Sequence, residues 1–187
     1  FFTESVKWIN SKCFRPMFFV DSHYLCPRFC VKYGESKWID RMKEADRHTD
    51  RIRVKPVATK QVMKDFVNLP RMIYADSPYY VPDLDQDIID TFDPRKNHGL
   101  EYSEVQPFVA YDIKRKPVGR IAAMINRQVN EKCGQRLCRF GYIDFVDDPE
   151  VSAALMKAAE EWGREQGMDR IIGPLGFTDL DHEGMLV

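Results

Sequence analysis

Ionisable side chains gather near the end of this 187-residue chain, in a stretch flanked by glycines. Asp179, Asp181, His182 and Glu183 follow one another within five positions. Carboxylates and an imidazole can ligate a metal ion or carry protons. They can also cap neighbouring elements in a polar loop, which is a frequent use of Asp in turns. Because no second group of ligands accompanies them, the spacing favours a polar loop and predicts no metal site.

Glycines also interrupt the stretch that precedes these carboxylates. The sequence Gly173-Pro-Leu-Gly-Phe-Thr178 continues an apolar, strand-like segment, although strands ordinarily avoid glycine and proline. A glycine in a strand lets a ligand or another backbone approach closely. We therefore predict that Gly173, Gly176 and Thr178, together with Asp179 and His182, line a substrate-binding site.

Asp144 is the candidate for acid–base chemistry. Alternation along the strand predicted over 137–146 places it on one face with Phe140 and Tyr142. Apolar surroundings disfavour the charged form of a carboxyl group, which suits a general base. The other interpretation is a carboxylate at a strand end that accepts a bond from a backbone amide. Asn126, at the end of another strand, either orients a polar group of a substrate or simply ends that strand.

Two further groups have both a chemical and a structural interpretation. His23, Cys26 and Cys30 have a spacing that zinc sites allow, but Cys13 would have to supply the fourth ligand, so scattered residues are the simpler interpretation. Aromatic residues near proline-rich turns could line an acceptor pocket or could simply pack. These aromatic residues are Tyr74, Tyr79, Tyr80 and Phe92.

The overall composition is that of a globular domain. The net charge is −1, with 30% charged and 44% hydrophobic residues. This balance argues against a nucleic-acid-binding protein. No apolar run approaches the ~18 residues of a membrane span, so no membrane partner is expected. The five cysteines, an odd number without framework spacing, favour a reducing compartment and predict a cytoplasmic protein. The oligomeric state is left open.

The first 41 residues differ from the rest. They hold six of the twelve Phe and three of the five Cys, without clear periodicity. We predict that residues 1–41 are an atypical N-terminal appendage, either additional to the fold or the result of a start assigned upstream of the true one. The folded domain is expected over residues 51–187.

The domain begins with a strand and helices. Residues 51–57 alternate apolar and basic side chains, which predicts a half-buried strand. Thr59 is a suitable N-cap for a helix that ends at Pro70, with a second helical piece after it. A short amphipathic helix is predicted over 83–92.

The rest of the domain is predicted to be a hairpin followed by a strand–helix–strand unit. The hairpin strands are 105–112 and 118–125, and the third strand is 137–146. Asp148 and Pro149 are typical of a helix start, and an apolar stripe continues that helix to about residue 166. A strand over 170–177 would lie parallel to the third strand.

Several short motifs are more specific than this pattern. They are Phe108-Val-Ala-Tyr111, Gly119-Arg-Ile-Ala-Ala123, Phe140-Gly-Tyr-Ile-Asp-Phe-Val146, Glu160-Glu-Trp-Gly-Arg-Glu-Gln-Gly-Met168 and Gly173-Pro-Leu-Gly-Phe-Thr-Asp179. With the order of elements, they resemble the GNAT superfamily of N-acyltransferases, and more narrowly a bacterial branch of it. The resemblance implies an α/β fold (α+β in some schemes) with a mixed sheet. It also implies a domain truncated at the C-terminus, because two further strands are expected after 170–177.

The resemblance implies acyl transfer from an acyl-CoA, such as acetyl-CoA, to an amine of a small molecule or a protein. The pantetheine would pair with Ile143, Phe145 and Val146, where the neighbouring strands splay apart. The diphosphate would lie at the start of the following helix, near Asp148 and Ser152, since a helix N-terminus offers free N–H groups and a positive dipole end. Asp144 would then be the base, and Asn126 and the 173–182 segment would contact the acceptor.

The chain departs from the family at the phosphate loop. Asp147, Asp148 and Glu150 stand where the family has spaced glycines and a basic or amide residue. Carboxylates repel a diphosphate. A second hypothesis therefore accompanies the first: a GNAT-like module that has lost CoA chemistry and binds a small molecule or a partner protein. The two differ in whether CoA or Asp148 occupies the helix start.

Overall fold

A computed structural model describes residues 31–32, 51–178, 181 and 184. These residues form a six-stranded sheet in the order β1-β6-β5-β4-β3-β2. Its strands are β1 (Val31–Lys32), β2 (Arg53–Pro56), β3 (Ser103–Tyr111), β4 (Pro117–Asn126), β5 (Leu137–Phe145) and β6 (Arg170–Ile172). All neighbours pair antiparallel except β5 and β6, which are parallel. The predicted hairpin and strand–helix–strand unit are therefore confirmed, as is the mixed sheet.

Five helices accompany the described strands. They are α2 (Lys60–Ile73), α3 (Asp85–Thr91), the 3-10 helix η2 (His98–Glu101), α4 (Arg127–Cys133) and α5 (Pro149–Glu165). Helix α4 was not predicted, because it lies in a segment that was interpreted as a connection. It forms because the Asn126 side chain accepts a bond from the Val129 N–H and because Gly134, at φ 59°, ends it in the left-handed region.

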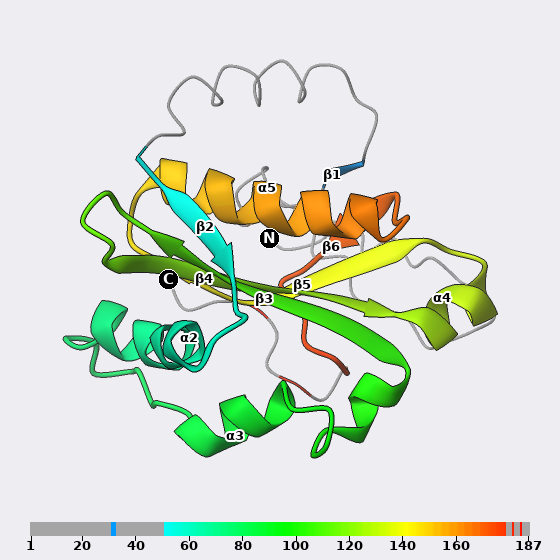
Figure 1. Cartoon of the computed structure of the whole chain (residues 1–187), viewed down its shortest axis with the longest axis horizontal. Helices are drawn as coiled ribbons and strands as arrows, with labels where there is room; N and C mark the ends of the chain where they lie inside the picture. The colour runs from blue at the N-terminus through cyan, green and yellow to red at the C-terminus, as the bar shows by residue number, and fades with distance from the viewer. Residues whose placement is uncertain (1–30, 33–50, 179–180, 182–183, 185–187) are drawn as a thin grey trace, which may run out of the picture.

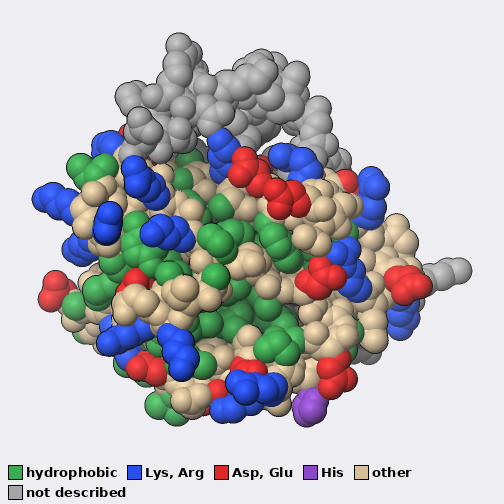
Figure 2. Space-filling view, in the orientation of Figure 1, with side chains coloured by type: hydrophobic (Ala, Val, Ile, Leu, Met, Phe, Trp, Pro, Cys, Tyr) green, Lys and Arg blue, Asp and Glu red, His purple; other side chains and the backbone are tan. Residues whose placement is uncertain are grey.

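The helices cover the two faces of the sheet (Figure 1). Helix α5 lies on one face, and α2 and α3 lie on the other. Two hydrophobic clusters fill the spaces between these layers. Leu155 and Ile121 belong to the cluster beneath α5, and Phe66 and Val109 belong to the cluster beneath α2. On the surface that faces the viewer in Figure 2, acidic and basic side chains are intermixed, as expected for a chain of nearly zero net charge.

Helix α2 runs through Pro70 to Ile73 as one helix, so the prediction that it ends at Pro70 was wrong. A proline inside a helix leaves the carbonyl four residues earlier without its N–H donor. That carbonyl belongs to Phe66, and the Arg120 guanidinium donates to it instead, at 3.0 Å from Nη1. A side chain from the sheet thus replaces the missing helical bond.

Strand β6 is shorter than predicted. It pairs with β5 only over Ile172 and the two residues before it, and the chain then leaves through a cis peptide bond between Gly173 and Pro174. Residues 31–32, which lie within the predicted appendage, pair with β6 on its other side. The remainder of residues 1–41 lies outside the described residues. None of the described helices is both long and apolar enough to cross a membrane.

Candidate functional site

Asp144 lies in a buried ion pair at the middle of the sheet. It stands opposite Arg120 of β4, and the Arg120 Nε lies 2.8 Å from Asp144 Oδ2. The side chains of Arg120 and Asp144 are only 6% and 11% exposed. The Tyr74 hydroxyl donates to the other carboxylate oxygen, Oδ1, at 2.9 Å. Both oxygens of Asp144 are therefore engaged, one by a guanidinium and one by a phenol.

Arg120 connects this carboxylate to helix α2. Besides donating to the Phe66 carbonyl, its guanidinium lies 5.0 Å from the centre of the Phe66 ring. Three of its interactions, with Asp144, the Phe66 carbonyl and the Phe66 ring, therefore fix its position. Because an unpaired buried charge is costly, each partner of this ion pair requires the other.

Tyr74 is the member of the network that is only half-buried, since it caps the end of α2. Burial raises its pKa, and the nearby Asp144 carboxylate raises it further, so the phenol keeps its proton at neutral pH. Tyr80 packs against it, with 5.2 Å between the ring centres, and burial raises the pKa of Tyr80 as well. The network therefore holds the Tyr74 hydroxyl in a fixed position, with the Asp144 carboxylate as its hydrogen-bond acceptor.

A β-bulge separates Asp144 from the first half of β5. Ile121 of β4 stands opposite two residues of β5, Tyr142 and Ile143, and Tyr142 has φ 50°. The expectation that Phe140, Tyr142 and Asp144 share one face was wrong. Phe140 lies in the cluster beneath α5, whereas Tyr142 and Asp144 face α2. The extra residue of the bulge reverses the alternation of side chains along β5 between Phe140 and Tyr142.

Strands β5 and β6 diverge beside this bulge. After β6 the chain makes one further backbone hydrogen bond to β5, in which the Leu175 N–H donates to the Phe140 carbonyl at 2.8 Å. Gly141 makes that approach possible, because a Cβ at this position would collide with the Leu175 carbonyl oxygen. Beyond Gly141, β4 is the one strand that pairs with β5 in the described part of the chain.

The residues predicted to pair with a pantetheine lie beyond this divergence. Ile143 is buried in the cluster beneath α5, and Phe145 and Val146 are half-buried against the same cluster. The Val146 N–H already donates to the Val118 carbonyl at 3.0 Å. The divergence is thus present where the resemblance implies it, but Val146 does not offer a free N–H.

The start of α5 is occupied by the chain's own side chains. Asp148 Oδ1 accepts a bond from the Glu150 N–H at 2.9 Å. Arg51 lies 3.3 Å from Asp148 Oδ2 and 3.6 Å from the Glu150 carboxylate. The Ser152 hydroxyl donates to the Pro149 carbonyl at 3.0 Å. A diphosphate of CoA does not fit these residues, because a carboxylate fills the helix N-terminus and the nearest cation already pairs with it.

The remaining predicted substrate residues that the structure describes make contacts within the chain itself. Asn126 caps α4 through its Oδ1. A Cβ at Gly173 would collide with the Phe140 carbonyl oxygen, and one at Gly176 would collide with Asp181, so at both glycines the chain itself makes the close approach. The Thr178 N–H donates to Asp181 Oδ2 at 2.7 Å. The predicted residues Asp179 and His182, like Glu183, lie outside the described residues.

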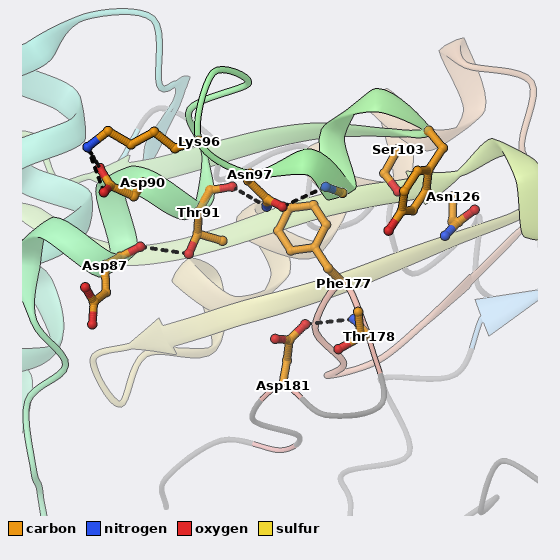
Figure 3. A pocket seen from close by; sticks show the side chains of 12 residues that line it. Asp87, Asp90, Thr91, Lys96, Asn97, Ser103, Asn126, Phe177, Thr178 and Asp181 are labelled. Atoms are coloured by element: carbon orange, nitrogen blue, oxygen red, sulfur yellow. Dashed lines mark hydrogen bonds and ion pairs between the residues drawn. The ribbon is translucent and has the colours of Figure 1, made fainter.

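Asn126 and Thr178 nevertheless line one pocket of about 470 Å³ (Figure 3). Its other walls come from α3, the loop after it and the first residues of β3. Those walls could not be predicted, because in the sequence Asp87, Asn97 and Ser103 have the types and positions of ordinary residues of loops and element starts. Of the predicted aromatic residues, Phe92 packs against Phe177 of this pocket, and Tyr79 is 84% exposed.

Two curated proteins are similar to this chain in sequence. Protein YghO of Escherichia coli K12 is 34% identical over 134 residues, which is 72% of this chain and 34% of that protein. Bacterial ceramide synthase of Caulobacter vibrioides is 35% identical over 133 residues, which is 71% of this chain and 34% of that protein. The chain therefore spans about a third of the length of the curated relatives it matches. No family model matches the chain.

Several solved structures are similar in fold, at low sequence identity. A tandem GNAT protein from the clavulanic acid biosynthesis pathway has a TM-score of 0.48 and 15% identity, covering 64% of this chain and 34% of that one. A GNAT-family acetyltransferase of Staphylococcus aureus Mu50 has a TM-score of 0.45 and 12% identity, covering 67% and 75%. The L-PGS structure from Bacillus licheniformis has a TM-score of 0.48 and 10% identity, covering 84% and 47%.

Proposed function

We propose that this chain is part of an N-acyltransferase, which joins an acyl group to the amine of an acceptor. The observation that carries the proposal is the 35% identity over 133 residues to a protein named Bacterial ceramide synthase. A ceramide is the amide of a fatty acid with a long-chain amino alcohol. The acceptor that this similarity supports is therefore a lipid-like amine, and the donor implied by the resemblance is an acyl-CoA.

The residues at the start of α5 argue against a donor diphosphate at that position. Asp148 caps the helix and Arg51 is paired with Asp148 and Glu150. We therefore place the diphosphate of the donor away from α5. In our proposal this domain binds the acceptor and removes the proton from its amine.

Tyr74 and Asp144 are the groups that we assign to that proton. An amine that attacks the thioester of an acyl-CoA forms the amide N–C bond and loses a proton, while the thioester C–S bond breaks and CoA leaves as its thiolate. In our proposal the amine passes this proton to the Tyr74 oxygen while Tyr74 passes its own proton to Asp144 Oδ1, 2.9 Å away. The Arg120 guanidinium, which donates to Asp144 Oδ2 at 2.8 Å, holds the carboxylate in position for this transfer. Groups in such roles contribute about 10²–10⁴-fold in rate.

The test is formation of the amide. The full-length protein is incubated with a long-chain amino alcohol and a series of acyl-CoAs, and the products are separated and identified by mass spectrometry. We expect an N-acyl product that depends on the protein and on both substrates. Absence of this product with every acyl-CoA, from protein shown to be folded, would overturn the proposal.

A second function is favoured by Asp148. If its carboxylate has permanently replaced a diphosphate, the chain is a GNAT-like module that binds a small molecule or a partner protein without acyl transfer. Calorimetry with acetyl-CoA and longer acyl-CoAs separates the two functions. Binding of an acyl-CoA to the full-length protein supports the transferase. Absence of binding with every acyl-CoA supports the module.

A further inference from the structure

Large apolar side chains are exposed where the chain passes from α2 to α3. Tyr79, Val81 and Leu84 are 84%, 83% and 69% exposed. Single exposed apolar side chains are ordinary on a protein surface, whereas several gathered in one segment mark a surface that contacts an apolar partner. We call residues 79–84 the apolar loop.

Contacts with α2 hold the apolar loop in place. The Arg71 guanidinium donates to the Asp83 carbonyl oxygen at 2.9 Å and pairs with the Asp85 carboxylate. The Tyr80 ring packs against that of Tyr74, with 5.2 Å between the ring centres. The exposed side chains therefore belong to a loop whose position is fixed at several points.

The apolar loop borders the proposed reaction site. Tyr80 lies within the loop, and its partner Tyr74 is the residue that takes the amine proton in our proposal. Tyr79 and Val81 flank Tyr80 in the chain. An acceptor whose amine reaches the Tyr74 oxygen would therefore lie next to exposed apolar groups.

A second exposed group lies in the turn between β3 and β4. Ile113 is 72% exposed, and Lys114, Arg115 and Lys116 follow it. Asp112 accepts a bond from the Lys116 backbone N–H, and none of the three cationic side chains pairs with a carboxylate among the described residues. Apolar side chains can enter the interface of a bilayer, and cations beside them are attracted to anionic lipids.

The apolar loop and this turn lie at the same end of the molecule (Figure 1). The C-terminal end of α2, from which the loop continues, and the turn are both on the left in that view. Pro117 begins β4 after the turn, three residues and about 10 Å along the strand from Arg120. Arg120 and Tyr74 both bind Asp144. Both exposed groups therefore lie at the end of the sheet that carries the proposed reaction site.

The cations at this end are concentrated around the turn. Arg53 and Lys55 of β2 pair with the last residues of β3, so they add to the three cations of the turn. The exposed carboxylates of Asp76, Asp83 and Asp147 lie in other segments. This end of the molecule thus has a basic part at the turn and an apolar part at the loop.

We infer that this end of the molecule, formed by the apolar loop and the β3–β4 turn, rests on the surface of an anionic phospholipid bilayer. The choice of a bilayer over another apolar partner rests on the proposed function, because a bilayer is where a long-chain amine is held. The loop side chains enter the interface and the turn cations contact lipid phosphates. The acceptor amine meets Tyr74 while its hydrocarbon chain stays in the bilayer.

This inference replaces the expectation that the protein has no membrane partner. That expectation rested on the lack of an apolar run long enough to span a bilayer. A contact at the surface requires no such run, because only a few apolar side chains enter the interface.

The experiment measures binding to vesicles alone, without any substrate. The full-length protein is sedimented with vesicles of phosphatidylcholine, prepared with or without phosphatidylglycerol. We expect binding at least about tenfold tighter to the anionic vesicles, weakened by added salt. No binding to the anionic vesicles, or equal binding to the two kinds, would overturn the inference.

A double variant tests the apolar loop. Tyr79→Ser combined with Val81→Ser should bind anionic vesicles at least about tenfold more weakly, because two apolar side chains no longer leave water. The melting temperature should not change, since both side chains are exposed. The matched control is Tyr102→Ser, which lies just before β3, at the opposite end of that strand from the turn. Wild-type binding by the double variant, or an equal loss in Tyr102→Ser, would contradict the role of the loop.

A single variant tests the turn. Lys114→Gln should weaken binding to anionic vesicles by about fivefold, the effect of one cation near a charged membrane surface. Any binding to phosphatidylcholine alone should stay at the wild-type level. An equal change with both kinds of vesicle, or no change with either, would show that the turn does not contact the lipid headgroups.

The same variants identify a different occupant of the apolar loop. If another part of the full-length protein or a second copy covers the loop, vesicles will not be bound. The double variant will then change the melting temperature or the oligomeric state, which thermal unfolding and light scattering measure. Either result would overturn the inference.

The transfer assay separates this inference from the proposed function. With a long-chain amino alcohol embedded in anionic vesicles, the double variant should form amide at least about tenfold more slowly than the wild type. With a short-chain, water-soluble amino alcohol the two rates should be equal. Glu161→Gln, which removes an exposed carboxylate from α5, is the control with both acceptors.

Vesicle binding without any amide product would count against the transferase and leave the membrane contact assigned. Amide formation without vesicle binding would count against the membrane contact alone.

Discussion

Pro70 and Arg120 show how a residue that weakens a helix can position a site. Pro70 removes one N–H from α2, and the freed Phe66 carbonyl accepts the Arg120 guanidinium. Arg120 in turn holds Asp144, which holds Tyr74. Neither Arg120 nor its link to Pro70 could be predicted from the sequence, because the partners are 50 residues apart. Asp144 could be selected, since an acidic residue in an apolar strand is uncommon.

The buried ion pair makes a prediction about stability. Asp144→Ala should lower the free energy of unfolding by about 3–5 kcal/mol, because Arg120 would remain buried without a counter-charge. Tyr74→Phe removes one hydrogen bond and should cost about 1 kcal/mol. Urea unfolding measures both. The control is Arg51→Ala, which breaks a largely exposed pair and should cost about 0–1 kcal/mol. A loss in Asp144→Ala no larger than in this control would contradict the prediction.

The tyrosines make a prediction about alkaline pH. Burial raises the pKa of Tyr111, and its bond to Asp65, 2.7 Å long, raises it further. Burial also raises the pKa of Tyr74. Above the ordinary pKa of 10.0, the unfolded phenols therefore lose protons that the folded ones retain, so stability should fall as the pH rises beyond 10.0. Tyr111→Phe should show a shallower fall in urea midpoint between pH 9 and 11. Identical slopes in the two proteins would refute this assignment.

At the scale of elements, the start of α5 was the part best predicted from sequence. Asp148, Pro149 and Glu150 begin the helix as expected, and the Asp148 side chain caps it. The bulge in β5 and helix α4 were not predicted. The bulge depends on pairing with β4, and α4 depends on a short cap–glycine signal that a connection can also carry.

The α5 cap predicts a difference between two substitutions. Asp148→Ala should lower the free energy of unfolding by about 1 kcal/mol, whereas Asp148→Ser keeps a cap oxygen and should cost less. Neither variant should gain measurable binding of CoA, because Glu150 remains at the helix start. Chemical unfolding and calorimetry provide the two measurements. Tight CoA binding by Asp148→Ser would show that a diphosphate site lies beneath the cap.

The crossing at Gly141 makes a prediction about local dynamics. In Gly141→Ala the new Cβ would collide with the Leu175 carbonyl oxygen, so the segment 173–177 must move from β5. The bond from the Leu175 N–H to the Phe140 carbonyl should then break. Hydrogen exchange at the Leu175 amide should become much faster, while amides of the β3–β4 ladder serve as the internal control. Unchanged protection at Leu175 would contradict the close crossing.

At the scale of the whole molecule, the order of the strands and of most helices followed from periodicity and capping signals, whereas the placing of α2 and α5 on opposite faces of the sheet is seen only in the structure. The pocket of Figure 3 could not be predicted either, because Ser103 and Asn126 are brought together by strand register and Phe177 by the path of the chain after β6. Local signals determine elements, whereas a site depends on contacts between segments that are distant in sequence. Asp144, Asn126 and Thr178 could be selected as candidates because each is a polar residue in an otherwise strand-like context, and their roles stay predictions.

The most direct measurement is the initial rate of amide formation by the full-length protein and three variants. Wild-type protein should convert a long-chain amino alcohol and an acyl-CoA to the amide, and Glu161→Gln should do so at the same rate. Tyr74→Phe and Asp144→Asn should be slower by about 10²–10⁴-fold while retaining their circular dichroism spectra. No amide from the wild-type protein, or wild-type rates in both folded variants, would contradict the assignment of N-acyl transfer to this site.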